Sequence, residues 1–191
     1  MNRSQTLLLV SLVALAPATA RADKYDDTIK VFRNAGQSQA FFDSCYGYAV
    51  FPTIGKGGIG IGGAHGSGRV YALGKHVGNT SMTQVTVGFQ FGGQAYSEIL
   101  FFQDQRAFDQ FTSGNFAFGA QATAVAITAG ASAQATTEGS GASASSSSDN
   151  ARTAGKYHKG MAVFTVAKGG LMYEASIGGQ KFSYKPNPPA K

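Results

Sequence analysis

The sequence predicts an α+β domain in which two short N-terminal helices precede an antiparallel, barrel-like β-sheet with one further short helix. Glycine makes up 26 of the 191 residues, which indicates many turns. Hydrophobic residues make up 43% and charged residues only 14%, and this composition excludes a disordered chain. Apolar residues follow a helical spacing near the N-terminus and then alternate at every second position, as in strands. The length suits one domain.

The first 22 residues have the features of a cleaved secretory signal peptide. Arg3 supplies a positive charge, residues 6–16 form a short apolar run, and Pro17 precedes small residues. The apolar run is about half as long as a membrane-spanning helix requires. Two Ala-x-Ala sequences overlap, and we favour cleavage after Ala22. We therefore expect an exported protein that is periplasmic or peripherally associated with the cell envelope.

Residues 24–44 are expected to form the two N-terminal helices. The apolar residues of the first lie four and three positions apart, on one helix face: Tyr25, Ile29 and Phe32. Gly36 interrupts this pattern, and Ser38 is the expected N-cap of the second helix. Asp104 is the expected N-cap of the third helix, which ends at Phe111.

Alternating apolar residues predict the strands. The clearest case is residues 84–91, where valine and phenylalanine would face the interior and the polar residues between them the solvent. Residues 58–62 also alternate, between glycine and isoleucine. Residues 116–135 favour a strand, with a helix as the alternative because alanine is frequent there. The remaining strands are expected at 96–102, 161–166, 171–177 and 181–184.

Residues 23–185 are expected to form a single domain. An uncharged serine-rich run predicts a flexible loop at about 138–155, and prolines predict a loose tail at 186–191. Two similar stretches each contain Lys-Gly-Gly. Because glycine supports tight turns, each stretch predicts a hairpin with an exposed lysine, Lys56 or Lys168, at its tip.

No catalytic site, metal site or cofactor is predicted. Two G-x-G-x-x-G patterns, at 55–60 and 58–63, lie in a predicted strand that no helix follows, which argues against a nucleotide site. Cys45, the single cysteine, cannot form an internal disulfide and is expected to be a small buried residue. It lies far from the cleavage site, so no lipid anchor is expected. Glu98 and Glu174 are expected on polar strand faces, and only their meeting in a cleft would favour an enzyme.

The charge distribution favours an anionic surface as partner. Residues 23–191 carry a net charge of +4, which is too weak to indicate nucleic acid binding, and export also argues against it. No acidic residue lies between Asp43 and Glu98. The basic residues that are candidates for binding anionic lipid lie mostly at predicted turns, at strand ends and on the first helix: Lys30, Arg33, Lys56, Arg69, Lys75, Lys156, Lys159 and Lys168.

Four stretches carry a family resemblance: YAVFPTIGKGGIGIGGAHGSGRVY (48–71), VGFQFGGQAYSEILFF (87–102), FAFGAQATAVA (116–126) and GMAVFTVAKGGLMYEASIGGQKF (160–182). Together they make residues 26–184 similar to the SYLF domain, a lipid-binding module related to the yeast Las17-binding actin-patch proteins. The resemblance implies helices followed by an antiparallel, barrel-like sheet. It also implies phospholipid binding through an N-terminal helix and a basic surface, without enzymatic activity.

The expected function is therefore non-catalytic binding of anionic phospholipid at a membrane surface of the cell envelope, through the exposed basic residues. The alternative is an envelope scaffold that binds protein partners through open strand edges. The two differ in their response to salt and to lipid charge, because attraction between exposed charges is screened within about 10 Å at 0.1 M salt.

Overall fold

The structure is a computed structural model, and it describes residues 23–59, 61–87, 92–119, 122, 124–127, 156–169 and 177–189. Helices α1 (Lys24–Asn34) and α2 (Gly36–Ser44) come first, and helix α3 (Gln105–Thr112) follows the fourth strand. The strands are β1 (Gly47–Ile59), β2 (Ile61–Ala72), β3 (Lys75–Val87), β4 (Gly92–Phe102), β5 (Val125–Ile127), β6 (Met161–Gly169) and β7 (Lys181–Pro186).

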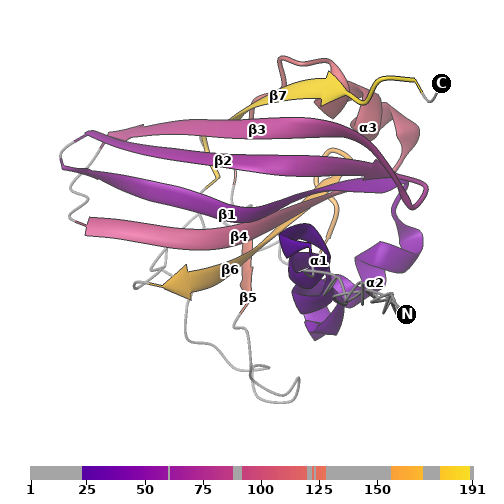
Figure 1. The fold of residues 1–191 in the computed structure, drawn as a ribbon, viewed down its shortest axis with the longest axis horizontal. Helices are drawn as coiled ribbons and strands as arrows, with labels where there is room; N and C mark the ends of the chain where they lie inside the picture. The colour runs from indigo at the N-terminus through magenta and orange to yellow at the C-terminus, as the bar shows by residue number, and fades with distance from the viewer. Residues whose placement is uncertain are drawn as a thin grey trace, which may run out of the picture.

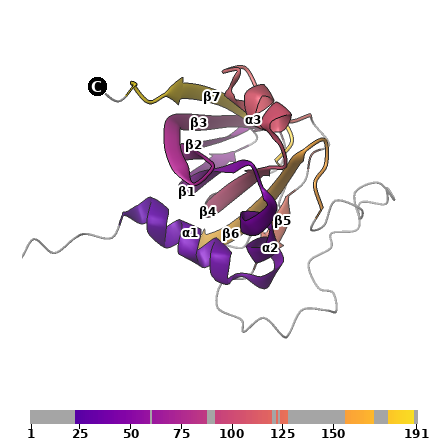
Figure 2. The ribbon, with the colours of Figure 1, turned by 90° about the vertical axis from the view of Figure 1, so that its right-hand side faces the viewer.

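Within the described ranges, the strands form one sheet in the order β5-β6-β4-β1-β2-β3-β7. Neighbouring strands are antiparallel except for β5 and β6, which are parallel. Figure 1 shows the long strands side by side, and Figure 2, which looks along them, shows that the sheet is curled. The predicted α+β class, with two helices before the sheet and one after β4, is confirmed.

The predicted sheet is present and curled, but its described strands do not close it into a barrel. β5 and β7 stand at opposite ends of the strand order and do not pair with each other. Instead, the chain that follows α3 changes partner: Ala117 forms a bridge with Lys181 of β7, whereas β5 pairs with β6. The Phe118 N–H also donates to the Gln180 carbonyl (2.9 Å). β5 has only three residues, and among the described strands the sheet is open between β5 and β7.

The curled sheet separates two hydrophobic cores. The interior core fills its concave side and includes Phe51, Ile54, Met82, Leu100, Phe102, Phe111 and Phe182. The helix core lies on the convex side, where α1 and α2 cover part of β1, β4 and β6, and it includes Tyr25, Ile29, Phe32, Phe41, Val50, Ile99, Phe101 and Phe164. The predicted apolar face of the first helix is thereby confirmed. Burial on both faces explains why residues 98–102 of β4 are all inaccessible to solvent.

The helix ends agree with the sequence in one case and differ in another. The Asp104 carboxylate accepts a hydrogen bond from the Ala107 N–H (2.8 Å), so its predicted role as N-cap of α3 is confirmed. Ser38 is not an N-cap, because α2 already begins at Gly36. The buried Ser38 hydroxyl instead donates to the Phe32 carbonyl (2.6 Å) and ties α2 to the end of α1.

Replacing Asp104 with alanine should therefore lower the free energy of unfolding by about 1 kcal/mol, because the capping carboxylate is lost. Urea unfolding followed by circular dichroism measures this loss. Asp109 lies exposed on the same helix with no capping contact among the described bonds. An equal loss in Asp109→Ala would show that helix charge, and not the cap, is responsible.

Of the strand predicted at 84–91, residues 84–87 are confirmed as a strand, but the predicted buried face is wrong. β3 runs to Val87, and residues 88–91 lie outside the described residues. Met82 and Gln84 face the interior, with 0% and 2% of their surfaces exposed, whereas Val85 is 73% exposed. The pairing with β2 sets this register, since Gln84 is opposite the buried Ala64.

Residues 58–62 do not belong to one strand, because β1 ends at Ile59 and β2 begins at Ile61. Ile59 of β1 is paired with Ile61 of β2, so the chain reverses between them. The predicted Lys-Gly-Gly turn is wrong for the same reason: β1 continues through Lys56, which is opposite Ala64. Lys168 is exposed near the end of β6, and residues 170–176, where its hairpin was expected to continue, lie outside the described part of the chain.

Several expectations lie outside the described residues. These are the signal peptide at 1–22, the loop at 138–155, the strand at 171–176, and Glu174. The expected strand at 116–135 is described only in part, and there β5 is the strand. The expected tail begins inside β7, and the Asn187 N–H donates to the Val77 carbonyl (2.9 Å).

Candidate functional site

Arg69 has a structural partner. Its guanidinium forms an ion pair with Asp23, the N-cap of α1, and lies 4.1 Å from the centre of the Tyr25 ring. The Tyr25 backbone N–H, together with Arg69, holds the pKa of the Asp23 carboxyl below its usual value. Arg69 therefore fastens the start of α1 to β2, and this accounts for its position better than a free binding role does.

The candidates on α1 are also engaged. Lys30 lies 3.6 Å from Asp27, and both side chains are exposed. Arg33 lies 4.3 Å from the centre of the Phe42 ring, so it joins the two helices by a cation–π contact. The exposed ion pair between Lys30 and Asp27 contributes little to stability. The Asp27 carboxylate nevertheless lowers the positive potential that Lys30 offers to a ligand.

Three further candidates are exposed at the end of the sheet where β4 meets α3. Lys75 begins β3 after the Leu73–Gly74 turn, and Lys156 and Lys159 precede β6. This end of the molecule also carries the exposed carboxylates Asp104 and Asp109.

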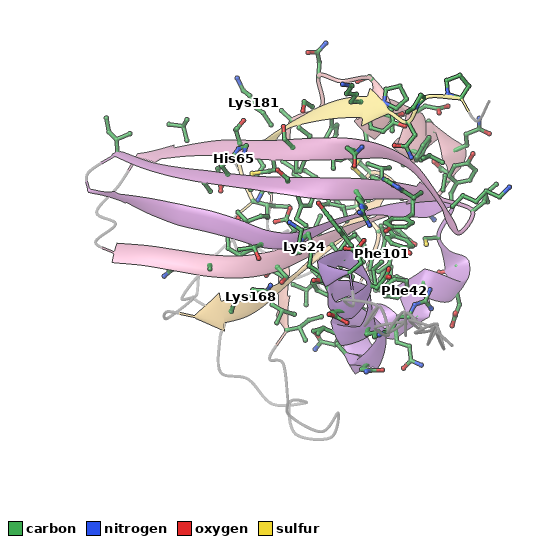
Figure 3. The ribbon with its side chains drawn as sticks, viewed as in Figure 1. Lys24, Phe42, His65, Phe101, Lys168 and Lys181 are labelled. Carbon is green, nitrogen blue, oxygen red and sulfur yellow. The ribbon has the colours of Figure 1, made fainter. Side chains whose placement is uncertain are left out.

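The last two candidates lie at the other end of the sheet, which extends beyond the helices in Figure 1. We call the described residues among 53–66, 81–87, 92–97, 165–169 and 181–183 the distal end. Lys56 is half-buried there, and the exposed Lys168 donates through Nζ to the Thr53 hydroxyl (3.1 Å). Lys181, which the sequence reasoning missed, is exposed at the start of β7 opposite Thr83. Figure 3 labels Lys168 and Lys181 on this helix-free part of the sheet.

Two large apolar side chains are exposed at the distal end. Val85 and Ile61 are 73% and 69% exposed, on the neighbouring strands β3 and β2. Val85 is opposite Gly63, two positions from Ile61, so the two side chains lie on the same face of the sheet. Lys181, opposite Thr83, lies on that face too. An apolar pair is thus placed beside a lysine on a surface that no described helix covers.

The acidic side chains lie elsewhere. Among the described residues, the carboxylates with exposed surface belong to the helices or to the residues next to them: Asp23, Asp26, Asp27, Asp43, Asp104 and Asp109. The distal end as defined carries three lysines and no carboxylate. It therefore presents positive charge together with apolar surface, a combination that suits an anionic, partly apolar partner.

Glu98 is not on a polar face, and that prediction is wrong. It is fully buried in the interior of the sheet, because β4 is covered on both sides. Its Oε2 accepts a hydrogen bond from Gln180 Nε2 (3.0 Å). Burial raises the pKa of Glu98 to about 7, although the Gln180 hydrogen bond acts in the opposite direction. Glu174, its proposed catalytic partner, lies outside the described residues.

Cys45 is the C-cap residue of α2 and is half-buried beside the helix core. It was predicted to be a small buried residue, and its burial is less complete than that. Desolvation raises the pKa of its thiol.

In the described part of the chain, no three His, Cys, Asp or Glu side chains are grouped so that they could hold a metal ion. None of the described helices has the length and apolar character needed to cross a membrane.

Comparison with known families identifies the domain. The sequence profile of the family described as Ysc84, Las17-binding protein actin regulator, matches residues 83–187. The chain belongs to this family. The resemblance to the SYLF domain is thereby confirmed, and the Ysc84 match covers the part of the fold from the end of β3 to β7.

A bacterial relative is similar over more of the chain. Beta cell expansion factor A of Aeromonas veronii is 28% identical over 158 residues, which are 81% of this chain and 51% of that protein. The chain thus spans about half the length of that relative. The Ysc84 family domain described here therefore has a bacterial counterpart within a longer protein.

Proposed function

We propose that this protein binds the surface of membranes that contain anionic phospholipid, without catalysis, and that the distal end of the sheet makes the contact. The observation that carries the proposal is the exposed pair Val85 and Ile61 beside lysines, on a surface without carboxylates among its described residues. Membership of the Ysc84 family, in which the SYLF resemblance implies lipid binding, supports it. We also propose that the protein acts in the cell envelope after export, as its N-terminal sequence suggests.

The two kinds of side chain have separate roles in this proposal. Each lysine near an anionic membrane contributes about 1 kcal/mol, and this contribution weakens with salt. Val85 and Ile61 enter the boundary between head groups and acyl chains, where their apolar surface leaves water. Since Lys181 and Val85 lie on one face of the sheet, both can meet the same membrane plane.

Binding to vesicles tests the proposal. The double variant Lys168→Glu/Lys181→Glu should bind vesicles of phosphatidylglycerol and phosphatidylcholine at least about thirtyfold more weakly than the natural protein does, because two attractive charges are lost. Flotation or sedimentation at low and at physiological salt gives the affinities. Vesicles of phosphatidylcholine alone should bind neither protein.

Two control variants locate the contact. Lys75→Glu/Lys159→Glu makes the same change of charge at the opposite end of the sheet and should change the affinity by less than about threefold at physiological salt, where distant charges are screened. Ile61→Ser/Val85→Ser should weaken binding but leave its salt dependence unchanged, because no charge is altered. Equal losses in both charge variants would contradict the distal end as the contact. A loss only in Lys30→Glu/Arg33→Glu would move the contact to α1.

The alternative, a scaffold that binds proteins through open strand edges, has less support. The edge of β7 is partly occupied, because Ala117 forms a bridge with Lys181 and the Phe182 N–H donates to the Phe116 carbonyl (2.8 Å). Failure to bind any anionic vesicle, combined with capture of an envelope protein that needs β7, would favour this alternative.

A further inference from the structure

Four polar side chains meet in the interior of the curled sheet, where apolar residues would be expected. Tyr96 and Glu98 come from β4, Thr165 from β6, and Gln180 from the residue before β7. Their exposed fractions are 6%, 0%, 1% and 0%. Gln180 Nε2 donates to Glu98 Oε2 (3.0 Å) and lies 3.4 Å from the Tyr96 hydroxyl oxygen. This cluster takes no part in the proposed membrane contact.

Three buried oxygen atoms of the cluster have no hydrogen-bond partner. Glu98 Oε1, Gln180 Oε1 and Thr165 Oγ1 are buried and make no hydrogen bond. Thr165 is directly opposite Glu98 in the ladder between β4 and β6, so their side chains point to the same face about 5 Å apart. Buried acceptors without donors are costly. An ionised Glu98 adds no donor to this group, whereas a protonated Glu98 adds one.

We propose that a proton on Glu98, held among Thr165, Gln180 and Tyr96, latches the turn at residues 177–180 to the sheet interior, and that loss of this proton releases the turn together with β7. The proton removes the buried charge and adds one donor to the cluster, which an unpartnered oxygen of Gln180 or Thr165 can accept.

No other titratable group that faces the interior, among the described residues, neutralises the charge of an ionised Glu98. Tyr96 is the nearest, and its pKa is raised, first by burial and then by Glu98, so its phenol stays neutral. Lys56 of β1 is opposite Gln94, two positions from Tyr96 along β4, and it does not contribute to the pKa of Glu98. Tyr184 of β7 is half-buried, and burial raises its pKa as well. Of the described residues, no cation lies against the Glu98 carboxyl.

Of the segments around Glu98, the turn at residues 177–180 is the one that can move. β4 and β6 are each paired on both sides, whereas residues 177–180 precede the last strand of the order. At its start the turn is anchored by Ile177, which is 2% exposed in the interior core and donates its N–H to the Ala122 carbonyl (3.2 Å). In the described part of the chain, residues 178–180 make few further hydrogen bonds to other elements. Gly179 N–H donates to the Phe118 carbonyl (3.2 Å), the Gln180 carbonyl accepts from Phe118 N–H (2.9 Å), and Gln84 Nε2 donates to the Gly178 carbonyl (2.9 Å). Opening here would admit water to an ionised Glu98 without separating the central strands.

Hydrogen exchange of individual amides tests the latch. After correction for intrinsic exchange, the opening constants at the Phe118, Gly179 and Phe182 amides should rise about tenfold per pH unit between about pH 4.5 and 7 and then level off. In Glu98→Gln, which carries a neutral amide at every pH, the same constants should not change with pH. Amides in the pairing of β1 with β4, such as those near Val50, serve as the internal control. They exchange when the whole domain opens, so their opening constants should be much smaller than those at the turn at each pH, although ionisation of Glu98 raises them too.

The pattern of exchange distinguishes the latch from a loss of stability throughout the domain and from a bound metal ion. Opening constants at the turn that are no larger than those near Val50 would overturn the latch, because the turn would then open only together with the whole domain. Opening constants of the natural protein that do not change with pH would also overturn the latch. A change at constant pH when choline replaces Na⁺ would show that a metal ion, and not a proton, occupies the cluster. Thr165→Val leaves Glu98 titratable but removes a neighbouring hydroxyl that can accept from its proton. The constants of this variant should level off at a lower pH, while the onset of their rise stays near pH 4.5.

Discussion

Phe101→Ala should lower the free energy of unfolding by about 3–5 kcal/mol, the largest loss that we expect from a single substitution in this protein. Phe101 is inaccessible to solvent and points from β4 into the helix core. Its ring centre lies 4.8 Å from that of Phe42, 5.5 Å from that of Phe41 and 5.9 Å from that of Phe164. Alanine would leave a cavity where α2 meets the sheet, and the helices depend on that contact.

Urea unfolding measures this loss, and two other variants give its scale. Phe101→Leu keeps most of the buried volume and should cost less than about 2 kcal/mol. Val31→Ala changes an apolar side chain of α1 that is 41% exposed and should cost less than about 0.5 kcal/mol. If Phe101→Ala lost no more than Val31→Ala, the packing of α2 on the sheet would be contradicted.

The second large effect is a fall in stability with rising pH that depends on Glu98. The pKa of Glu98 is raised from 4.5 to about 7 in the folded protein, chiefly by burial. The folded state therefore binds more protons than the unfolded state between these pH values, and its stability decreases as pH rises through that window. A shift of this size corresponds to a loss of about 3 kcal/mol in the free energy of unfolding. This loss is absent below pH 4.5 and is complete above pH 7.

Comparison with Glu98→Gln isolates this effect, because the other titrating groups are common to both proteins. The difference in unfolding free energy between them should change by about 3 kcal/mol from pH 4 to pH 8, with the variant gaining relative to the natural protein. A difference that stays constant over this range would mean that Glu98 is solvated. This measurement concerns the whole domain, so it can succeed even if the local release of the 177–180 turn does not occur.

Local signals in the sequence were sufficient for much of the fold. The apolar spacing of Tyr25, Ile29 and Phe32 and the cap at Asp104 depend on neighbours within a few residues, and both predictions were confirmed. Whether a barrel-like sheet closes depends on which strands, far apart in the chain, become neighbours, and no local pattern could predict this. The face of β3 was wrong for the same reason, since pairing with β2 decides whether Gln84 or Val85 is buried.

The candidate site was predicted only in part. Lys168 could be found because a lysine beside two glycines indicates an exposed strand end, and it is exposed. Arg69 belonged to the same group of candidates, but its partner Asp23 is 46 residues away and no short motif reveals the pair. The exposed valine of β3 was missed because alternation alone cannot distinguish the two faces of a strand. The glycines and alanine at 62–68, which make one face of β2 small, were a signal that could have set the register.

The order of strands in the sheet has a consequence for how the chain folds. β1, β2 and β3 follow one another and pair as a meander, so they can form from short loops. The other edge of β3 can pair with β7 only after a long stretch of chain has been made. Thr80 and Ser183, which are joined by a hydrogen bond, are 103 residues apart. Until synthesis reaches β7, the nascent chain carries an exposed strand edge that can pair with another copy. Assembly of the last strand is therefore the stage at which a chaperone would be most useful to this protein.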